Sequence, residues 1–376
     1  MYLICVCEKV FMNILFLCNT YYQLIIAMQL KMTQFAQDEV YLILSDHSRN
    51  SKVVVNNLKT TEIFKDVYHI ETQELDYTGL EKKNLLFSIP PIILGNSKRF
   101  DLVSNLKIDK LVYYNFFVSV QQLFSVLYKS NHKLQCARME EGILAYQMHY
   151  NDNKYHWGRK LSSVIYSSRK LLGEKNLYEC VNDFYCFQPD FYNGILNPVK
   201  IEPVSSDGQL KDFLVKAFDI RLSENDYKEK YIFFTSVYDF EGGEPIGEYE
   251  LVCKIVDLVG KENLLIKTHP RDTRTIYEDK GFTVDKNSSV PWEAIQLSRD
   301  FSDKVFLTVN SGSVLAGSFM SDNPPKTFFM HRCCNIDDNV SAKTAVDTIE
   351  KLLSEESLKP SLKTVAIAND VKDILI

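Results

Sequence analysis

Long apolar stretches are missing from this sequence. Nowhere do about 18 consecutive apolar residues occur, so no membrane-spanning helix is expected. Residues 1–18 are apolar but are interrupted by Glu8, Lys9 and Asn13, and they lack the basic start and the cleavage site of a signal peptide. Met12 directly precedes the first expected strand and is an alternative start of the chain.

Paired cysteines are missing as well. The chain has 9 cysteines, an odd number, and none of them forms a CxxC pair or stands close to two histidines. This spacing excludes the usual structural zinc sites and argues against a disulfide framework. We therefore expect a reducing, cytoplasmic compartment, with most of the cysteines acting as small buried apolar residues.

Basic charge and the common nucleotide motifs are also absent. The formal net charge of −6 argues against a dedicated nucleic-acid-binding protein. No P-loop lysine, no GxGxxG after a strand and no DxD motif occurs, which weakens ATP-, dinucleotide- and metal-dependent alternatives. No metal site and no cofactor are expected.

What the chain does contain is an alternation of apolar strands and amphipathic helices. With 376 residues, 45% of them hydrophobic, it is long enough for two domains. Such alternation predicts parallel βαβ units. Strands are expected at 13–18, 40–44, 110–114, 134–138, 231–235, 264–266, 305–309 and 326–330, and helices at 23–31, 118–128, 248–259, 292–297, 312–318 and 342–353.

The pattern loosens around residues 198–230, where proline, serine, aspartate and glycine are typical of a linker. We predict a domain over 1–204, a second over 205–340, and a C-terminal helical segment over 341–376, with a helix at 361–376 crossing back to the first domain. Two Rossmann-like α/β domains facing a central cleft are the plan of GT-B-type enzymes, although other two-domain α/β proteins share it.

The strand at 263–266 is followed by Lys267-Thr-His-Pro-Arg-Asp272. In open α/β sheets, ligands bind at the carboxyl ends of strands. His269 can exchange a proton near neutral pH, Pro270 stiffens the turn, and Arg271 adds a cation. These residue types predict an anion site that contains a proton donor.

Two carboxylates, Glu140 and Glu141, follow the strand at 134–138 and precede Gly142. Crowding of like charge would raise the pKa of one of them, which suits a general base. The alternative is an exposed charged turn. The residues alone do not decide which carboxylate is the base.

Asn310-Ser-Gly-Ser313 follows another strand and opens a helix. Hydroxyls and free N–H groups there can hold a phosphate, so Ser311, Gly312 and Ser313 are candidate binding residues. The alternative is a serine N-cap.

Glu293, after Pro291 and Trp292, is a candidate ligand for ribose hydroxyls, or else a favourable carboxylate in a first helical turn.

A basic amphipathic helix is expected at 157–172, with Arg159, Lys160, Arg169 and Lys170 among apolar residues. It could rest on an anionic membrane surface. The alternative is a helix that packs its apolar face on the core and leaves its charges in water.

Taken together, the motifs resemble bacterial sialyltransferases, particularly the lipooligosaccharide and capsule enzymes of glycosyltransferase family 52. These families share a D/E-D/E-G motif, an HP motif and a later serine motif, matched by Glu140-Glu141-Gly142, His269-Pro270 and Ser311-Gly-Ser313. The opening Cys18-Asn-Thr-Tyr-Tyr-Gln-Leu24 is also similar. The Glu-Glu pair departs from the Asp-Asp of lipooligosaccharide enzymes and is typical of polysialyltransferases. The resemblance covers residues 12–335.

The resemblance implies metal-independent, inverting transfer of sialic acid from CMP-sialic acid to a galactose-terminated glycan of lipooligosaccharide or capsule. Glu140 or Glu141 would take the acceptor proton, and His269 would serve the leaving phosphate, which Ser311 and Ser313 would hold. A lipid-linked acceptor would give the basic helix a place at the inner membrane face. The alternatives are a family 52 glucosyltransferase, a UDP-sugar 2-epimerase-like isomerase and a non-catalytic glycan-binding protein.

Overall fold

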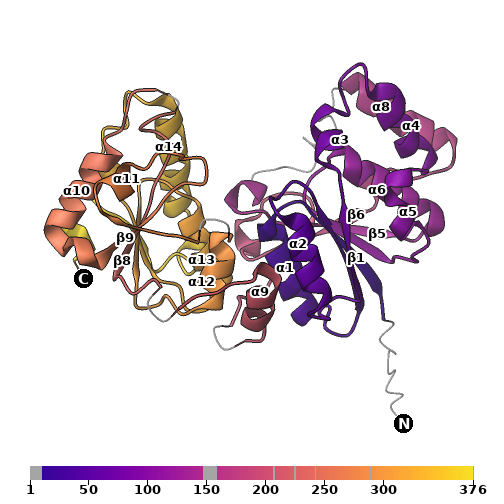
Figure 1. The fold of residues 1–376 in the computed structure, drawn as a ribbon. Helices are drawn as coiled ribbons and strands as arrows, with labels where there is room; N and C mark the ends of the chain where they lie inside the picture. Colours follow the sequence, from indigo (N-terminus) through magenta and orange to yellow (C-terminus); the bar gives the residue numbers. More distant parts are fainter. Residues whose placement is uncertain are drawn as a thin grey trace, which may run out of the picture. The chain divides into compact units, whose positions relative to one another are not determined.

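The computed structural model describes residues 11–146, 159–205, 208–223, 226–241, 243–287 and 290–375. The chain divides into two compact units, one ending at Ile201 and the other beginning at Glu202. Both units are α/β structures built on parallel sheets, so the predicted Rossmann-like fold class is confirmed (Figure 1).

The first unit contains a seven-stranded sheet with the order β3-β2-β1-β4-β5-β6-β7, and all of its pairs are parallel. The order reverses between β1 and β4, which makes that position the topological switch point. The strands are β1 (Asn13–Cys18), β2 (Glu39–Ser45), β3 (Asp66–Ile70), β4 (Lys110–Tyr113), β5 (Gln135–Met139), β6 (Val181–Cys186) and β7 (Asn197–Lys200).

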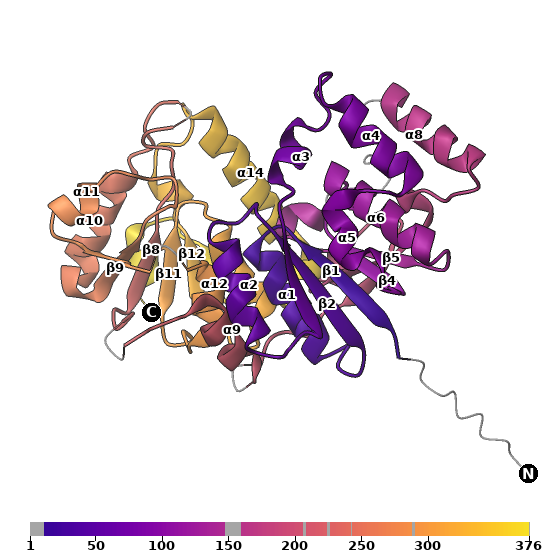
Figure 2. The ribbon, with the colours of Figure 1, turned by 45° about the vertical axis from the view of Figure 1, so that its right-hand side comes forward.

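Helices cover both faces of this sheet, with α1 and α2 on one side and α5 and α6 on the other (Figure 2). Helix α6 is buried along most of its length, because α3, α4 and α5 pack on it in turn. Such coverage explains why the strands are continuous apolar runs. The helices are α1 (Tyr21–Met32), α2 (Ser51–Lys59), α3 (Gln73–Thr78), α4 (Leu85–Leu94), α5 (Asp101–Ser104), α6 (Val118–Ser130) and α8 (Arg159–Leu171).

The second unit contains a six-stranded parallel sheet with the order β10-β9-β8-β11-β12-β13. Its switch point lies between β8 and β11. The strands are β8 (Tyr231–Phe234), β9 (Leu264–Lys267), β10 (Thr283–Val284), β11 (Val305–Thr308), β12 (Lys326–Phe329) and β13 (Val365–Ile367). The helices are α9 (Leu210–Phe218), α10 (Glu248–Val259), α11 (Ile276–Asp279), α12 (Trp292–Ser298), α13 (Ser313–Met320) and α14 (Val340–Ser354).

The end of the chain differs from the prediction. The predicted helix over 361–376 is not observed: the described residues 361–375 contain no α-helix and instead hold β13 and a short 3₁₀ turn at Val371–Ile374. Strand β13 pairs with β12, so residues 341–375 continue the second unit and are not a separate helical segment. The expected linker at 198–230 is also partly regular, since it contains all of β7 except its first residue and the whole of α9. Short edge strands carry too few residues for a clear periodicity.

The basic helix is present as α8, and residues 157 and 158 lie outside the described part of the chain. Arg169 is not a surface charge. It is buried, and its guanidinium donates to the carbonyl of Ile92 over 2.6 Å and to Ser125 Oγ over 2.7 Å. Lys170 is exposed. Among the described residues, we find no helix with both the length and the apolar character needed to cross a membrane.

Candidate functional site

The acid pair lies where β5 ends, next to the switch point of the first sheet. Strands β1, β4 and β5 are neighbours and run parallel, so the loops after them emerge at one edge. Glu140 and Glu141 follow β5, and the loop with Thr20 follows β1. This edge is the expected position for a ligand in an open α/β sheet.

Glu140 is completely buried, and protein donors occupy both of its carboxylate oxygens. Tyr22 donates its hydroxyl to Oε1 over 2.6 Å. The hydroxyl of Tyr146 and the backbone N–H of Phe187, the latter at 2.9 Å, donate to Oε2. Burial raises the pKa of Glu140, and these hydrogen bonds oppose that rise. Glu140 therefore joins three segments of the first unit and presents no free oxygen.

Glu141 is only partly buried, and it is the member of the pair that solvent reaches. Burial raises its pKa, while hydrogen bonds with the side chains of Thr20 and Gln23 lower it. Burial prevails. Gly142 adopts a φ of +69°, where a side chain would be strained. The expected cause of the pKa shift was wrong, because burial raises both pKa values and repulsion between the two carboxylates is not among the causes.

In the second unit, the histidine loop and the serine turn emerge from strands on either side of β8. Lys267, Phe234 and Thr308 stand level with one another in the registers of β9, β8 and β11. His269 lies two residues beyond Lys267, and Ser311 lies three residues beyond Thr308. Adjacent strands are separated by about 4.8 Å. Both predicted motifs therefore lie at the carboxyl edge of the same three strands.

His269 is held by hydrogen bonds at two points. Its backbone N–H donates to Thr235 Oγ1 over 2.9 Å, and its ring Nδ1 accepts the backbone N–H of Arg271 over 3.1 Å. An accepting Nδ1 places the proton of the neutral ring on Nε2. Burial and the Arg271 charge lower the pKa of His269. The Nε2–H is thus the donor that the loop can offer a ligand, while Pro270 is exposed in the turn.

The serine turn is open. Helix α13 begins at Ser313 without a side-chain cap. In the described part of the chain, the hydroxyls of Ser311 and Ser313 have no hydrogen-bond partner. The serine N-cap alternative is therefore not met. The start of helix α10, by contrast, is capped by a side chain. Asp239 accepts four backbone N–H groups there, at 2.9 to 3.3 Å.

Glu293 lies in the first turn of α12, which starts at the carboxyl edge of the sheet after β10. The helix begins with Trp292, whose ring is buried against Phe234 and Phe306. Burial raises the pKa of Glu293, and the positive charge of Lys267 lowers it. The carboxylate therefore lies within electrostatic reach of the end of β9, and both the ribose and the helix-turn interpretations remain compatible with it.

Comparison with known proteins adds the decisive observation. The family model for alpha-2,8-polysialyltransferase (POLYST) matches residues 14–300. The chain belongs to this family. The match includes the acid pair, the histidine loop and Glu293, and it ends before the serine turn. It confirms the recognised relationship to bacterial sialyltransferases, and a member of this family is a glycosyltransferase. No curated protein matches the sequence.

Solved structures resemble this polysialyltransferase-family chain only distantly. A UDP-N-acetylglucosamine 2-epimerase has a TM-score of 0.47 at 10% identity, covering 96% of this chain and 93% of its own. The UDP-GlcNAc 2-epimerase from Neisseria meningitidis gives 0.42 at 12%, covering 97% and 98%. The E. coli heptosyltransferase WaaC gives 0.39 at 9%, covering 85% and 87%. Similarities this weak carry no argument about the substrate of the family member described here.

Several residues of the two edges were not predicted individually. Thr20, Tyr22 and Gln23 lie in the opening segment that resembles the family, and the structure uses all three to hold the acid pair. Glu248 is buried, and both of its oxygens accept the N–H of Ser236 after β8, at 3.0 and 2.8 Å. Burial raises the pKa of Glu248 to about 8. The sequence signal that could have indicated Glu248 was an acidic residue in the first turn of a predicted helix.

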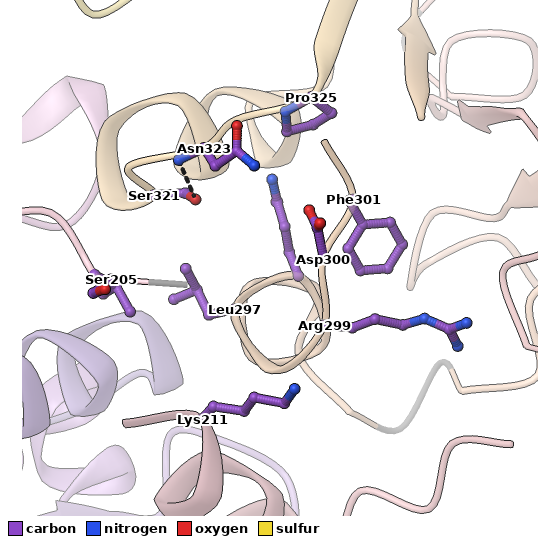
Figure 3. A pocket seen from close by; sticks show the side chains of 11 residues that line it. Ser205, Lys211, Leu297, Arg299, Asp300, Phe301, Ser321, Asn323 and Pro325 are labelled. Carbon is purple, nitrogen blue, oxygen red and sulfur yellow. Dashed lines mark hydrogen bonds between the residues drawn. The ribbon is translucent and has the colours of Figure 1, made fainter. Parts of the chain in front are cut away.

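A separate pocket lies at the opposite, amino-terminal edge of the second sheet (Figure 3). Its volume is about 210 Å³, and none of the predicted site residues lines it. It is bordered by the segments that precede β11 and β12, including Asp300, Phe301 and Asn323, and by Lys211 of α9. Within the described ranges, no group of three or more His, Cys, Asp or Glu side chains is arranged to hold a metal ion.

Proposed function

We propose that this glycosyltransferase moves sialic acid from CMP-sialic acid to a sugar hydroxyl, with inversion and without a metal cofactor. Membership of the alpha-2,8-polysialyltransferase family is the observation that carries the proposal. The site geometry supports it, because a proton donor and an open phosphate-type turn share one edge of the second sheet.

The partly exposed Glu141 takes the proton of the acceptor hydroxyl in this proposal. Glu140 is less suitable, because protein donors occupy both of its oxygens. A raised pKa makes Glu141 a stronger base once it is deprotonated. Glu140 instead positions the loop that carries its neighbour.

The CMP leaving group receives its hydrogen bonds in the second unit. His269 offers its Nε2–H to the departing phosphate as a hydrogen bond, and the protonated ring can transfer that proton to the phosphate and return to its neutral form. Ser311, Ser313 and the first N–H groups of α13 hold the phosphate oxygens, as helix N-termini commonly do. Glu293 accepts from the ribose hydroxyls. Hydrogen-bond donors of the protein would thus stabilise the negative charge that develops on the departing CMP phosphate.

The acceptor in this proposal is a glycan, and two kinds of glycan should be tested side by side as acceptors. The resemblance to lipooligosaccharide and capsule sialyltransferases implies a galactose-terminated glycan. The family description specifies an alpha-2,8 linkage, which is formed on a sialic acid residue. A chain that already ends in sialic acid is therefore the second acceptor to test.

The deciding experiment measures CMP release from CMP-sialic acid with no acceptor, with lactose, and with an α-2,8-linked sialic acid oligomer, all in the presence of EDTA. Release that is stimulated by an acceptor and survives EDTA is the expected result, and NMR of the product then fixes the linkage and the acceptor class. Failure to bind CMP or to release it would overturn the donor assignment. Turnover of a UDP-sugar would then favour a different glycosyltransferase or an epimerase.

A further inference from the structure

One side of helix α4 exposes only apolar side chains to solvent. Leu86, Phe87 and Leu94 are 81%, 78% and 50% exposed, and Pro90 is exposed between them. The spacing of Phe87, Pro90 and Leu94 places them along one helix face. Contiguous apolar surface of this kind is uncommon on soluble monomers and marks a contact with another molecule or with a membrane.

The end of helix α8 lies beside α4 and carries further exposed apolar side chains. The hydrogen bond from Arg169 Nη1 to the carbonyl of Ile92, at 2.6 Å, fixes the end of α8 beside the end of α4. Leu171 and Leu172 follow directly and are 88% and 55% exposed. Both views show the two helices side by side at the margin of the first unit (Figures 1 and 2). We call the side chains Leu86, Phe87, Pro90, Leu94, Leu171 and Leu172 the α4–α8 surface.

The inner side of α4 is firmly attached to the unit. Ile89 and Ile92 are buried in a cluster with Val118 of α6 and Ile165 of α8. Gln122 of α6 donates to the carbonyl of Ser88 over 2.9 Å. The exposed side chains therefore stand on a packed helix, and their exposure does not come from a loose segment.

Cations flank the helices of the α4–α8 surface along the chain. Lys82 and Lys83 precede α4, Lys98 and Arg99 follow it, and the exposed Lys170 lies next to Leu171. The ammonium of Lys129 lies 3.4 Å from the carbonyl of Leu94. Glu81 is paired with Lys83 over 3.0 Å, Asp101 follows α4, and Glu174 after α8 lies 3.8 Å from the Arg169 guanidinium. This margin is locally positive on a chain whose formal net charge is −6.

We propose that the α4–α8 surface docks the protein onto a membrane surface that carries anionic lipid headgroups. Apolar side chains on an anchored helix can enter the boundary between headgroups and acyl chains, while lysines at its rim meet lipid phosphates. The sequence pointed to the charges of α8, but the structure buries Arg169 and makes α4 the centre of the contact. A symmetric second copy fits less well, because it would oppose two rims of like charge.

The proposal goes beyond the sialyltransferase assignment, because lipid binding can be measured without substrate. The full chain is sedimented with vesicles of phosphatidylglycerol and phosphatidylethanolamine, and with vesicles of phosphatidylcholine alone, at low and high salt. We expect binding to the anionic vesicles that weakens at high salt. The double variants Phe87→Glu/Leu94→Glu and Lys82→Glu/Lys98→Glu should each reduce this binding at least tenfold.

The matched controls are Ile195→Glu, which alters a 65% exposed apolar residue elsewhere in the first unit, and Lys351→Glu in α14 of the second unit. Both should bind anionic vesicles like the unaltered chain. All variants should retain their circular dichroism and their turnover of a soluble acceptor, because the changed residues are exposed and lie outside the candidate site. Phe87→Ser provides a milder version should the charged replacement disturb folding.

Two results would overturn the proposal. One is the absence of anionic vesicle binding by the unaltered chain, or binding that the α4–α8 variants leave unchanged. The other is a dimer in solution that Phe87→Glu dissociates, because the surface would then be a subunit interface. Neither result would bear on the donor assignment, which CMP release tests separately.

Discussion

Tyr22 and Glu140 stand 118 positions apart in the chain and are joined by a hydrogen bond of 2.6 Å. The bond ties the first turn of α1 to the carboxylate after β5. It therefore links the segments that follow β1 and β5, the two strands that flank β4 in the first sheet. The candidate base Glu141 is held between the same loops through Thr20 and Gln23.

Removing this bond should destabilise the first unit. Tyr22→Phe leaves Oε1 of a buried carboxylate without its donor, which typically costs about 1–3 kcal/mol. It should also raise the pKa of Glu140 further, because the Tyr22 bond lowers it. Urea unfolding measures the loss. Tyr41→Phe is the control, since its hydroxyl makes only an exposed 3.4 Å contact with Glu39 and its removal should have little effect.

The two acidic residues should respond differently to amidation. Glu141→Gln should lower kcat by about 10²–10⁴-fold with little change in stability, as expected on loss of a general base. Glu140→Gln should act mainly through folding, because the residue is buried among three donors. Steady-state kinetics combined with unfolding curves separates these effects. A stable but inactive Glu140→Gln beside an active Glu141→Gln would transfer the base role to Glu140.

The acid limb of the pH profile should reveal Glu141. A base works only when deprotonated, and burial raises its pKa, so kcat/KM should fall with decreasing pH at a point above the usual glutamate range. Thr20→Val removes a hydrogen bond that lowers this pKa and should shift the limb to higher pH. Thr20→Ser keeps the hydroxyl and should leave it in place. An identical limb in both variants would contradict the assignment.

His269 should control the alkaline limb of the pH profile. A general acid works only when protonated, and its pKa is lowered by burial and by Arg271, so kcat/KM should fall as pH rises through a value below 6.5. Arg271→Ala should raise this pKa and move the limb to higher pH, and NMR titration of the imidazole would show the same shift. Arg221→Ala removes an exposed arginine that pairs with Asp219 and should change neither measurement. If the limb persists in His269→Ala, another group is the acid.

Gly312 offers a probe of the serine turn that should not disturb folding. Its φ is −66°, and no atom lies within 4 Å of where a Cβ would stand, so Gly312→Ala should be as stable as the unaltered chain. A methyl group there would nevertheless approach a phosphate held by Ser311 and Ser313. We expect a higher KM for CMP-sialic acid, with CMP binding by calorimetry weakened in parallel. Unchanged CMP affinity would remove the turn from the donor site.

Local sequence patterns were sufficient for the central strands and for the motifs that end them. Asn13–Cys18 and Glu248–Val259 form the predicted strand and helix, because long apolar or amphipathic runs carry a strong periodicity. The strand β13 and the helix α9 were not predicted, because these short elements depend on packing partners, β12 and α12, that lie far away in the chain.

The sequence by itself determined where along the chain the acid pair, the histidine loop and the serine turn stand, since each follows a short apolar run that predicts a buried strand. Tertiary structure decided what each side chain is exposed to. It buried Glu140 and left Glu141 within reach of solvent, and it turned the apolar side of α4 outward while burying Arg169. These outcomes depend on contacts between segments distant in the chain, and local periodicity carries no information about such contacts.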